Sequence, residues 1–358
     1  MPAKLIKLYP ENYEPEQLKL PAQVMAQGGL VIFPTETVYG IGANANISSA
    51  VSRLVEIKQS LPGRPFTVHL SSAAQVYQHI NQIPRFAHRL MRYFWPGPLT
   101  IILSRFNGTD KTWVGFRLPD NKIARHLIAL SYVSIIASSA NPAGTPPPVE
   151  AENLFNIFEN KVDYIITAGP TKYRNESTVV RVAEDSHWEV LRIGAITPDE
   201  IKKLDYKMIL FVCTGNTCRS PMAVGLFKKI LSQKSGIKEI DLEKSGYRII
   251  SGGTAAIYNA PATSNAVAAL KEFGSDISGH LSQPVTLTMI EEADEVFTMT
   301  QGHLMTLKKW AASSAHKIKL LDPAGEDITD PIGGSLETYR QCALRIKSGL
   351  EQIAANYK

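Results

Sequence analysis

The chain has 358 residues, of which 44% are hydrophobic and 20% are charged, and its formal net charge is +5. This length favours two domains, and the ordinary composition excludes a low-complexity or disordered protein. The basic residues are spread over both halves, which suits anionic small molecules and permits weak nucleic-acid contact without indicating it. Three cysteines, an odd number, do not make a disulfide framework, so we expect a reducing compartment.

The N-terminal residues lack the apolar core of a secretory signal, and no apolar run approaches the length that crosses a membrane. We therefore expect a soluble, cytoplasmic protein with no membrane partner.

The first half of the chain predicts a mixed, twisted sheet with three or four helices. Its apolar runs predict strands, but they do not alternate strictly with helical stretches, as a purely parallel sheet would require. The expected strands are residues 29–34, 99–103, 133–137, 164–166, 178–182 and 189–193.

Cations and polar side chains follow several of these apolar runs. The cations are Lys58, Arg64, Arg117 and Arg192, and the hydroxyl and amide donors beside them are Thr35, Ser139, Asn141 and Ser177. Converging cations and donors of this kind describe a cavity for a polyphosphate and a carboxylate. For any single Lys or Arg, solvated surface charge is the commoner explanation. We assign Trp113 to packing only.

A series of segments resembles, in order, the YrdC family of L-threonylcarbamoyladenylate synthases over roughly residues 10–200. They include GGLVIFPTETVYGIGANA (28–45), EIKQSLPGRPFTVHL (56–70), VGFRLPDNK (114–122), ASSANPAGTPPP (137–148) and STVVRV (177–182). The resemblance implies a YrdC-like fold in which L-threonine, bicarbonate and ATP give threonylcarbamoyl-AMP and pyrophosphate. The product would pass to the tRNA-modification machinery that forms threonylcarbamoyladenosine.

The same resemblance implies two sets of ligand-binding residues. L-threonine would be held by Thr35, His69, Arg117, Ala137 and Ser177. ATP would be held by Lys58, Ser139, Asn141 and Arg192, with Mg²⁺ on its phosphates. Catalysis would rest on positioning and charge stabilisation rather than on a covalent intermediate.

One position departs from the family pattern, which is Lys-x-Arg-Pro after the lysine. Here Lys58 is followed by Gln59, Ser60 and Leu61, so the arginine is missing at Ser60. Either Arg64 reaches the ATP phosphates from the next turn, which we favour because the other contacts are present, or this half has lost its activity. In the second case it would be a non-catalytic RNA- or nucleotide-binding module.

A polar stretch at 196–207 separates the halves, and a fresh strand begins at Met208, so we expect domains of residues 1–206 and 207–358. Beyond the boundary, strand-like runs alternate with helical stretches and a long helix begins near Ser335. This alternation predicts an α/β domain with a Rossmann-like, four-stranded parallel sheet flanked by helices. Its active site is expected at the carboxyl ends of the strands.

The turn between the first strand and helix of this domain, LFVCTGNTCRSPMA (210–223), predicts a nucleophilic cysteine in an anion cradle. Unpaired N–H groups and a helix N-terminus favour a phosphate there, and Arg219 is a bidentate donor to it. The same groups stabilise a thiolate at Cys213, which Ser220 can hydrogen-bond. The alternative is a buried core thiol. The cradle itself comprises Thr214, Gly215, Asn216, Thr217 and Cys218.

A phosphocysteine mechanism also needs a general acid, and Asp330 in ITDPIGGSLETY is the candidate, with a plain Asp-Pro turn as the alternative. Together with SGGTAAIYNAPAT and DISGHLSQPVT, these motifs resemble the low-molecular-weight protein tyrosine phosphatases over residues 208–358. The resemblance implies a phosphoprotein substrate and no cofactor, and we assign no metal-ligating residues.

Two features resemble the protein-arginine phosphatase branch of that family. Thr214 stands where tyrosine phosphatases carry a bulkier apolar residue, and Ile332 and Gly333 stand where they carry an aromatic one. Phosphoarginine is therefore favoured over phosphotyrosine.

The remaining cysteines have weaker assignments. Within the family, Cys218 can close a reversible disulfide on Cys213 that prevents over-oxidation, and packing at the base of the loop is an equal alternative. Arsenate reduction on the same fold would need further cysteines, and only Cys342 remains, far along the last helix. We therefore expect a bifunctional synthase and phosphatase.

Overall fold

The computed structural model describes residues 2–59, 66–107, 110–142, 144–151 and 154–357. The chain divides into two compact units, Met1–Leu204 and Asp205–Lys358, each built around its own sheet. Within the described residues, no helix is both long and apolar enough to cross a membrane.

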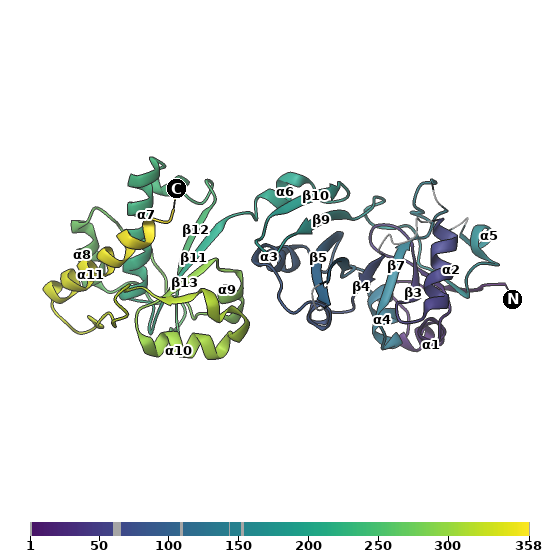
Figure 1. The fold of residues 1–358 in the computed structure, drawn as a ribbon, viewed down its shortest axis with the longest axis horizontal. Coiled ribbons are helices and arrows are strands. Elements are labelled where there is room, and N and C mark those ends of the chain that lie inside the picture. Colours follow the sequence, from purple (N-terminus) through teal and green to yellow (C-terminus); the bar gives the residue numbers. More distant parts are fainter. Residues whose placement is uncertain (1, 60–65, 108–109, 143, 152–153, 358) are drawn as a thin grey trace. The chain divides into compact units, whose positions relative to one another are not determined.

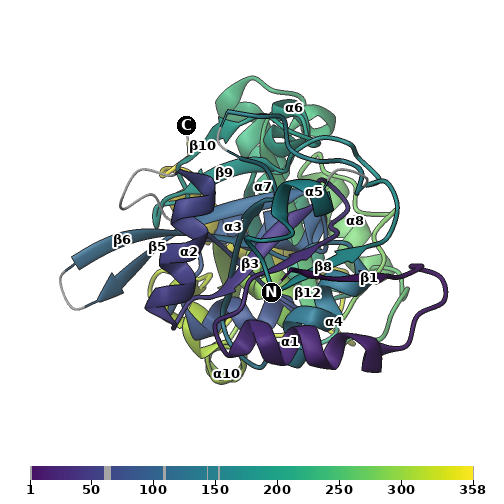
Figure 2. The ribbon, with the colours of Figure 1, turned by 90° about the vertical axis from the view of Figure 1, so that its right-hand side faces the viewer.

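The first unit contains a ten-stranded mixed sheet, which confirms the predicted fold class (Figure 1). The spatial order is β1-β8-β2-β3-β7-β4-β6-β5-β9-β10, with parallel pairs β1–β8, β2–β8, β4–β6 and β5–β9 and antiparallel neighbours elsewhere. The strands are β1 (Lys4–Lys7), β2 (Val31–Phe33), β3 (Gly40–Asn44), β4 (Thr67–His69), β5 (Leu99–Asn107), β6 (Asp110–Arg117), β7 (Ile135–Ser139), β8 (Tyr164–Thr167), β9 (Thr178–Val182) and β10 (Trp188–Arg192). Strands β5 and β6 run side by side as a long hairpin (Figure 2).

At β2 both faces of this sheet are covered, and the strand is apolar on both sides. In β2, Ile32 packs in one hydrophobic cluster, and Val31 and Phe33 pack in the other. The first cluster includes residues of α2 and α3, and the second includes residues of α1 and α4. The helices are α1 (Lys19–Ala26), α2 (Ser48–Lys58), α3 (Arg85–Phe94), α4 (Lys122–Ser131), α5 (Leu154–Phe158) and α6 (Pro198–Lys202).

The second unit has the predicted four-stranded parallel sheet, in the order β12-β11-β13-β14. Its strands are β11 (Lys207–Cys213), β12 (Tyr247–Gly253), β13 (Glu295–Thr298) and β14 (Ile318–Leu320). Its helices are α7 (Arg219–Ser235), α8 (Ser264–Glu272), α9 (Leu287–Glu292), α10 (Gln301–Trp310) and α11 (Leu336–Ala354).

Alternate residues of β11 point to opposite faces of this sheet. Ile209 and Phe211 pack in the cluster that includes α7, α8 and α11, whereas Leu210 and Val212 pack with α9 and α10. The helices are labelled in Figure 1. The strand is therefore held from both sides up to its carboxyl end at Cys213.

Candidate active sites

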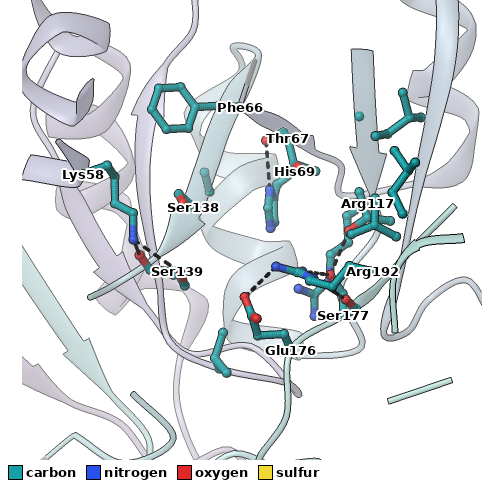
Figure 3. A pocket seen from close by; sticks show the side chains of 18 of the residues that line it. Lys58, Phe66, Thr67, His69, Arg117, Ser138, Ser139, Glu176, Ser177 and Arg192 are labelled. Atoms are coloured by element: carbon teal, nitrogen blue, oxygen red, sulfur yellow. Dashed lines mark hydrogen bonds and ion pairs between the residues drawn. The ribbon is translucent and has the colours of Figure 1, made fainter. Parts of the chain in front are cut away.

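A cavity of about 820 Å³ opens in the first unit (Figure 3). Its floor is a row of residues paired across five neighbouring strands by the sheet register: Ala137, Thr67, Gly115, Ile102 and Arg181. All nine predicted ligand-binding residues that the structure describes line it: Thr35, Lys58, His69, Arg117, Ala137, Ser139, Asn141, Ser177 and Arg192. Ser60 and Arg64 lie outside the described residues.

Lys58, the last residue of α2, reaches across to the end of β7. Its ammonium donates to the carbonyl oxygens of Ser139 (2.8 Å) and Asn141 (2.7 Å) and to Asn141 Oδ1 (2.8 Å). In Figure 3, Lys58 and Ser139 lie on one side of the cavity, and Arg117, Ser177 and Arg192 lie across from them. The helix end and the strand end thus bring a cation and polar oxygens to one wall.

Arg117 is held on the opposite wall by the turn that contains Thr35. Its Nη2 donates to Glu36 Oε1 at 2.8 Å and to Thr37 Oγ1 at 2.6 Å, and both partners are buried. The buried Nε of Arg117 bonds no described residue. Because both hydrogens of Nη2 are used, the guanidinium is fixed in orientation and keeps donors for a ligand.

His69 lies between the two walls, at the end of β4 (Figure 3). Burial, with the positive charge of Arg117, lowers the pKa of its imidazole to about 3. The ring is therefore neutral near pH 7. Its Nδ1 lies 3.1 Å from the carbonyl oxygen of Thr67, so Nδ1–H donates and Nε2 is left as an acceptor.

Ser177 and Arg192 form a third polar group at the start of β9 and the end of β10. Arg192 donates from Nη2 to the carbonyl oxygen (2.9 Å) and Oγ (3.0 Å) of Ser177, and from Nη1 to Glu176 Oε1 (2.5 Å). Thr100 Oγ1 lies 2.9 Å from Ser177 Oγ. Both arginines among the predicted ligand-binding residues that the structure describes are therefore paired with one carboxylate, Arg117 with Glu36 and Arg192 with Glu176.

The sequence analysis missed several lining residues. Trp113 was assigned to packing only, yet it lines the cavity, and its ring lies 5.0 Å from Lys111 Nζ and 5.3 Å from the guanidinium of Arg181. A signal was available, since Trp113, Gly115 and Arg117 alternate along β6 and therefore share one face of the sheet. The two carboxylates carried no comparable signal.

In the second unit the predicted cysteine loop follows β11 and precedes α7. Cys213 is 2% exposed, and its sulfur accepts the backbone N–H of Asn216 at 3.2 Å. Ser220 Oγ lies 3.0 Å from the sulfur and accepts a hydrogen bond from Asn216 Nδ2 at 2.8 Å. The serine hydroxyl hydrogen is thus left to point at the sulfur, so two donors face the nucleophile.

Asn216 holds the loop in shape from its centre. Its backbone is left-handed (φ 56°) and its side chain is fully buried. Nδ2 also donates to Ser251 Oγ (2.8 Å), and Oδ1 accepts from the backbone of Gln283 (2.9 Å). His280 Nε2 lies 2.7 Å from the carbonyl oxygen of Asn216. These distant partners were not predicted from the sequence.

Gly253 lets the end of β12 approach the loop closely. A Cβ at this position would lie 2.3 Å from the carbonyl oxygen of Thr214, which is far inside van der Waals contact. The loop is tied to the same segment because Thr254 and Ala255 donate their backbone N–H groups to the carbonyls of Cys213 (2.9 Å) and Thr214 (3.0 Å).

Arg219 and Asp330 are brought together although 111 residues separate them. Arg219 is buried at the first turn of α7, where Nη1 donates to the carbonyl oxygen of Ile328 at 3.0 Å and Nη2 forms an ion pair with Asp330. The predicted arginine and the predicted acid therefore belong to the same site.

All three cysteines are free thiols. Cys218 lies beneath the loop, 3.4 Å from both Thr263 Oγ1 and Tyr339 OH. Cys342 lies on α11, where burial raises the pKa of its thiol to about 12. Cys342 is therefore a poor nucleophile at neutral pH.

Two family models match separate parts of the chain. Residues 23–194 match the Sua5/YciO/YrdC model, described as "Telomere recombination". Residues 208–358 match the model for low molecular weight phosphotyrosine protein phosphatases.

Curated relatives divide in the same way. The threonylcarbamoyl-AMP synthase of Pyrococcus abyssi is 37% identical over 54% of this chain and 58% of its own length. A putative threonylcarbamoyl-AMP synthase of Methanocaldococcus jannaschii is 33% identical over 51% of this chain and 89% of its own. The protein-arginine-phosphatase of Bacillus subtilis is 36% identical over 42% of this chain and 96% of its own. The matched part therefore spans little more than half of the P. abyssi protein.

A solved structure of a P. abyssi Sua5 variant is 26% identical, with a TM-score of 0.52 over 97% of each chain. It supports the fold of the first unit. Since the chain covers most of the M. jannaschii and B. subtilis relatives, both resemblances inferred from the sequence are confirmed. The chain belongs to the Sua5/YciO/YrdC family through its first unit and to the low-molecular-weight phosphotyrosine protein phosphatase family through its second.

Proposed function

We propose that the protein is a bifunctional enzyme. Residues 1–206 form threonylcarbamoyl-AMP from L-threonine, bicarbonate and ATP, and residues 207–358 dephosphorylate proteins through a phosphocysteine. The observation that carries the first activity is that all nine described candidate residues line one cavity. The second rests on a thiol that receives two hydrogen bonds beside an arginine and an acid.

Different residues of the cavity suit the two larger substrates, L-threonine and ATP. The donors that Arg117 keeps suit the carboxylate of threonine, and neutral His69 accepts a hydrogen bond from its hydroxyl or amino group. The threonine nitrogen attacks bicarbonate, water leaves, and the carbamate that forms attacks the α-phosphorus of ATP through one oxygen and displaces pyrophosphate. Lys58 and Arg192 stabilise the charge on the phosphates during this transfer.

Mg²⁺ would accompany ATP and draw negative charge from its phosphates. Magnesium sites in proteins use oxygen ligands, commonly one or two carboxylates together with substrate phosphates. Among the described lining residues, Glu176 alone carries a carboxylate, and it is bonded to Arg192. The donor set therefore fits an ion held chiefly by ATP itself.

The synthase is tested by pyrophosphate release from purified full-length protein given L-threonine, bicarbonate and ATP. Release that requires all three substrates supports the proposal. Absence of release, with ATP still bound in calorimetry, would instead favour a non-catalytic nucleotide-binding module. The proposed contact of Arg64 with ATP remains a prediction from the sequence.

The paired carboxylates allow the two substrate sets to be separated. We expect Glu36→Gln to raise KM for L-threonine about tenfold, because Arg117 loses a charged hydrogen bond that orients it. The KM of the same variant for ATP should change by less than about twofold, which is smaller than the effect of losing one hydrogen bond. The matched variant Glu176→Gln, which releases Arg192, should raise KM for ATP instead. If both variants raised KM for L-threonine and KM for ATP equally, this assignment of Arg117 to threonine and Arg192 to ATP would be contradicted.

In the phosphatase, the Cys213 sulfur attacks phosphorus and the bond to the leaving group breaks. A phosphate bound in the loop would take the Arg219 guanidinium from Asp330, whose freed carboxylate takes up a proton from solvent and gives it to the leaving group. Water then attacks the phosphocysteine, gives a proton back to Asp330 and releases the thiolate stabilised by Ser220.

We expect Asp330→Asn to slow hydrolysis of alkyl phosphates by about a hundredfold, but that of p-nitrophenyl phosphate much less, because a good leaving group needs no proton. The measurement is kcat/KM for a series of leaving groups. A uniform loss across the series would show that Asp330 acts only by holding Arg219.

We further propose phosphoarginine as the preferred substrate, since Thr214 and the absence of a ring at Ile332 favour it over phosphotyrosine. Cys218 would protect Cys213 by a reversible disulfide.

The odd cysteine count supports a cytoplasmic location, where the adenylate would pass to the tRNA-modification machinery.

A further inference from the structure

Thr214, the first residue after the nucleophile, is tied to a helix distant in the sequence. Its Oγ1 lies 2.9 Å from Nε2 of His303 on α10. Thr214 is exposed at the mouth of the loop, whereas His303 is only 8% exposed. A rigid, buried ring therefore holds an exposed hydroxyl beside the reacting thiol.

The ring is itself held from below. His303 Nδ1 lies 2.8 Å from Oγ1 of Thr300, the residue that caps the N-terminus of α10 by accepting the backbone N–H of His303 at 3.3 Å. Burial, together with the positive charge of Arg219, lowers the pKa of His303. A neutral imidazole carries one hydrogen, so both ring nitrogens are used, one as donor and one as acceptor.

We infer that His303 is a positioning residue that sets the substrate preference of the phosphatase by fixing the Thr214 hydroxyl toward the leaving group. This inference rests on the proposed phosphatase function. A fixed hydroxyl can hydrogen-bond the N–H groups of a guanidinium leaving group, whereas a phenyl ring offers no such donor. Without His303, the Thr214 side chain rotates freely and its methyl group competes for the same place.

The test is a double-mutant cycle on the full-length protein with His303→Phe, Thr214→Val and the two combined. We measure kcat/KM for a phosphoarginine peptide and for a phosphotyrosine peptide. His303→Phe should lower the ratio of the two values about three- to tenfold, the effect of one lost hydrogen bond. In the Thr214→Val background the same change should leave the ratio unaltered. His316→Phe, at an exposed histidine of the same unit, is the matched control.

Three results would overturn the inference. The first is that His303→Phe lowers the ratio of the two kcat/KM values equally in the wild-type and Thr214→Val backgrounds. The second is an equal fall in kcat/KM for both peptides, and the third is a change in the ratio of similar size in His316→Phe. If His303→Phe does not fold, His303→Gln, whose amide can still bond Thr214, must keep the wild-type ratio for the inference to stand. A wild type that hydrolyses neither peptide nor p-nitrophenyl phosphate rejects the proposed phosphatase itself, before any variant is compared.

Discussion

Cys213→Ser is expected to abolish phosphatase turnover, by at least about a thousandfold, while the second unit stays folded. Serine preserves the size of the side chain and the hydrogen bonds from Asn216 and Ser220, but its hydroxyl is not a thiolate. The measurements are phosphate release from p-nitrophenyl phosphate and the thermal unfolding midpoint of the variant.

Cys342→Ser is the matched control for this loss. That thiol lies on α11 and donates to the carbonyl oxygen of Thr329 at 3.7 Å, outside the loop. It should keep most of the wild-type turnover. Turnover above about one per cent in Cys213→Ser would contradict the covalent mechanism.

Lys58→Met should reduce ATP-dependent pyrophosphate release about ten- to a hundredfold, the effect of one lost charged hydrogen bond to a phosphate. The methionine fills similar space but leaves the oxygens of Ser139 and Asn141 without a cation. Phosphatase activity of the same sample should be unchanged, because the second unit has its own core.

An exposed lysine provides the control. Lys19, whose partner is Glu16, lies outside the cavity, so Lys19→Met should leave pyrophosphate release unaltered. Full release in Lys58→Met would show that Lys58 only braces the end of β7.

The fold could be predicted where apolar runs are continuous. Strand β11 is such a run, whereas β3 contains Gly40 and Gly42 and was missed because glycine disfavours strands. The structure gives the reason for Gly42: a Cβ there would lie 2.8 Å from the Phe33 ring and 3.2 Å from Met25 Sδ. Glycine is needed here because neighbouring elements pack closely against the strand. The local sequence pattern does not show such packing.

The residues of the two sites also differ in whether the sequence could predict them. Residues that form motifs, such as Lys58 and Cys213, could be named from the sequence. Glu36 and His303 could not, because their roles depend on partners 81 and 89 residues away. A buried carboxylate and a buried imidazole have no local signature, and only the folded chain shows which groups they hold.

The close approach of Gly253 to the Thr214 carbonyl has a consequence for how the gene tolerates variation. Gly253 contributes no chemical group, yet any side chain there must displace the backbone that follows the nucleophile. A genetic screen for loss of dephosphorylation would therefore recover alleles at codon 253 alongside those at Cys213 and Arg219. Selection on the chemistry of one loop thus acts on a strand forty residues further along the chain.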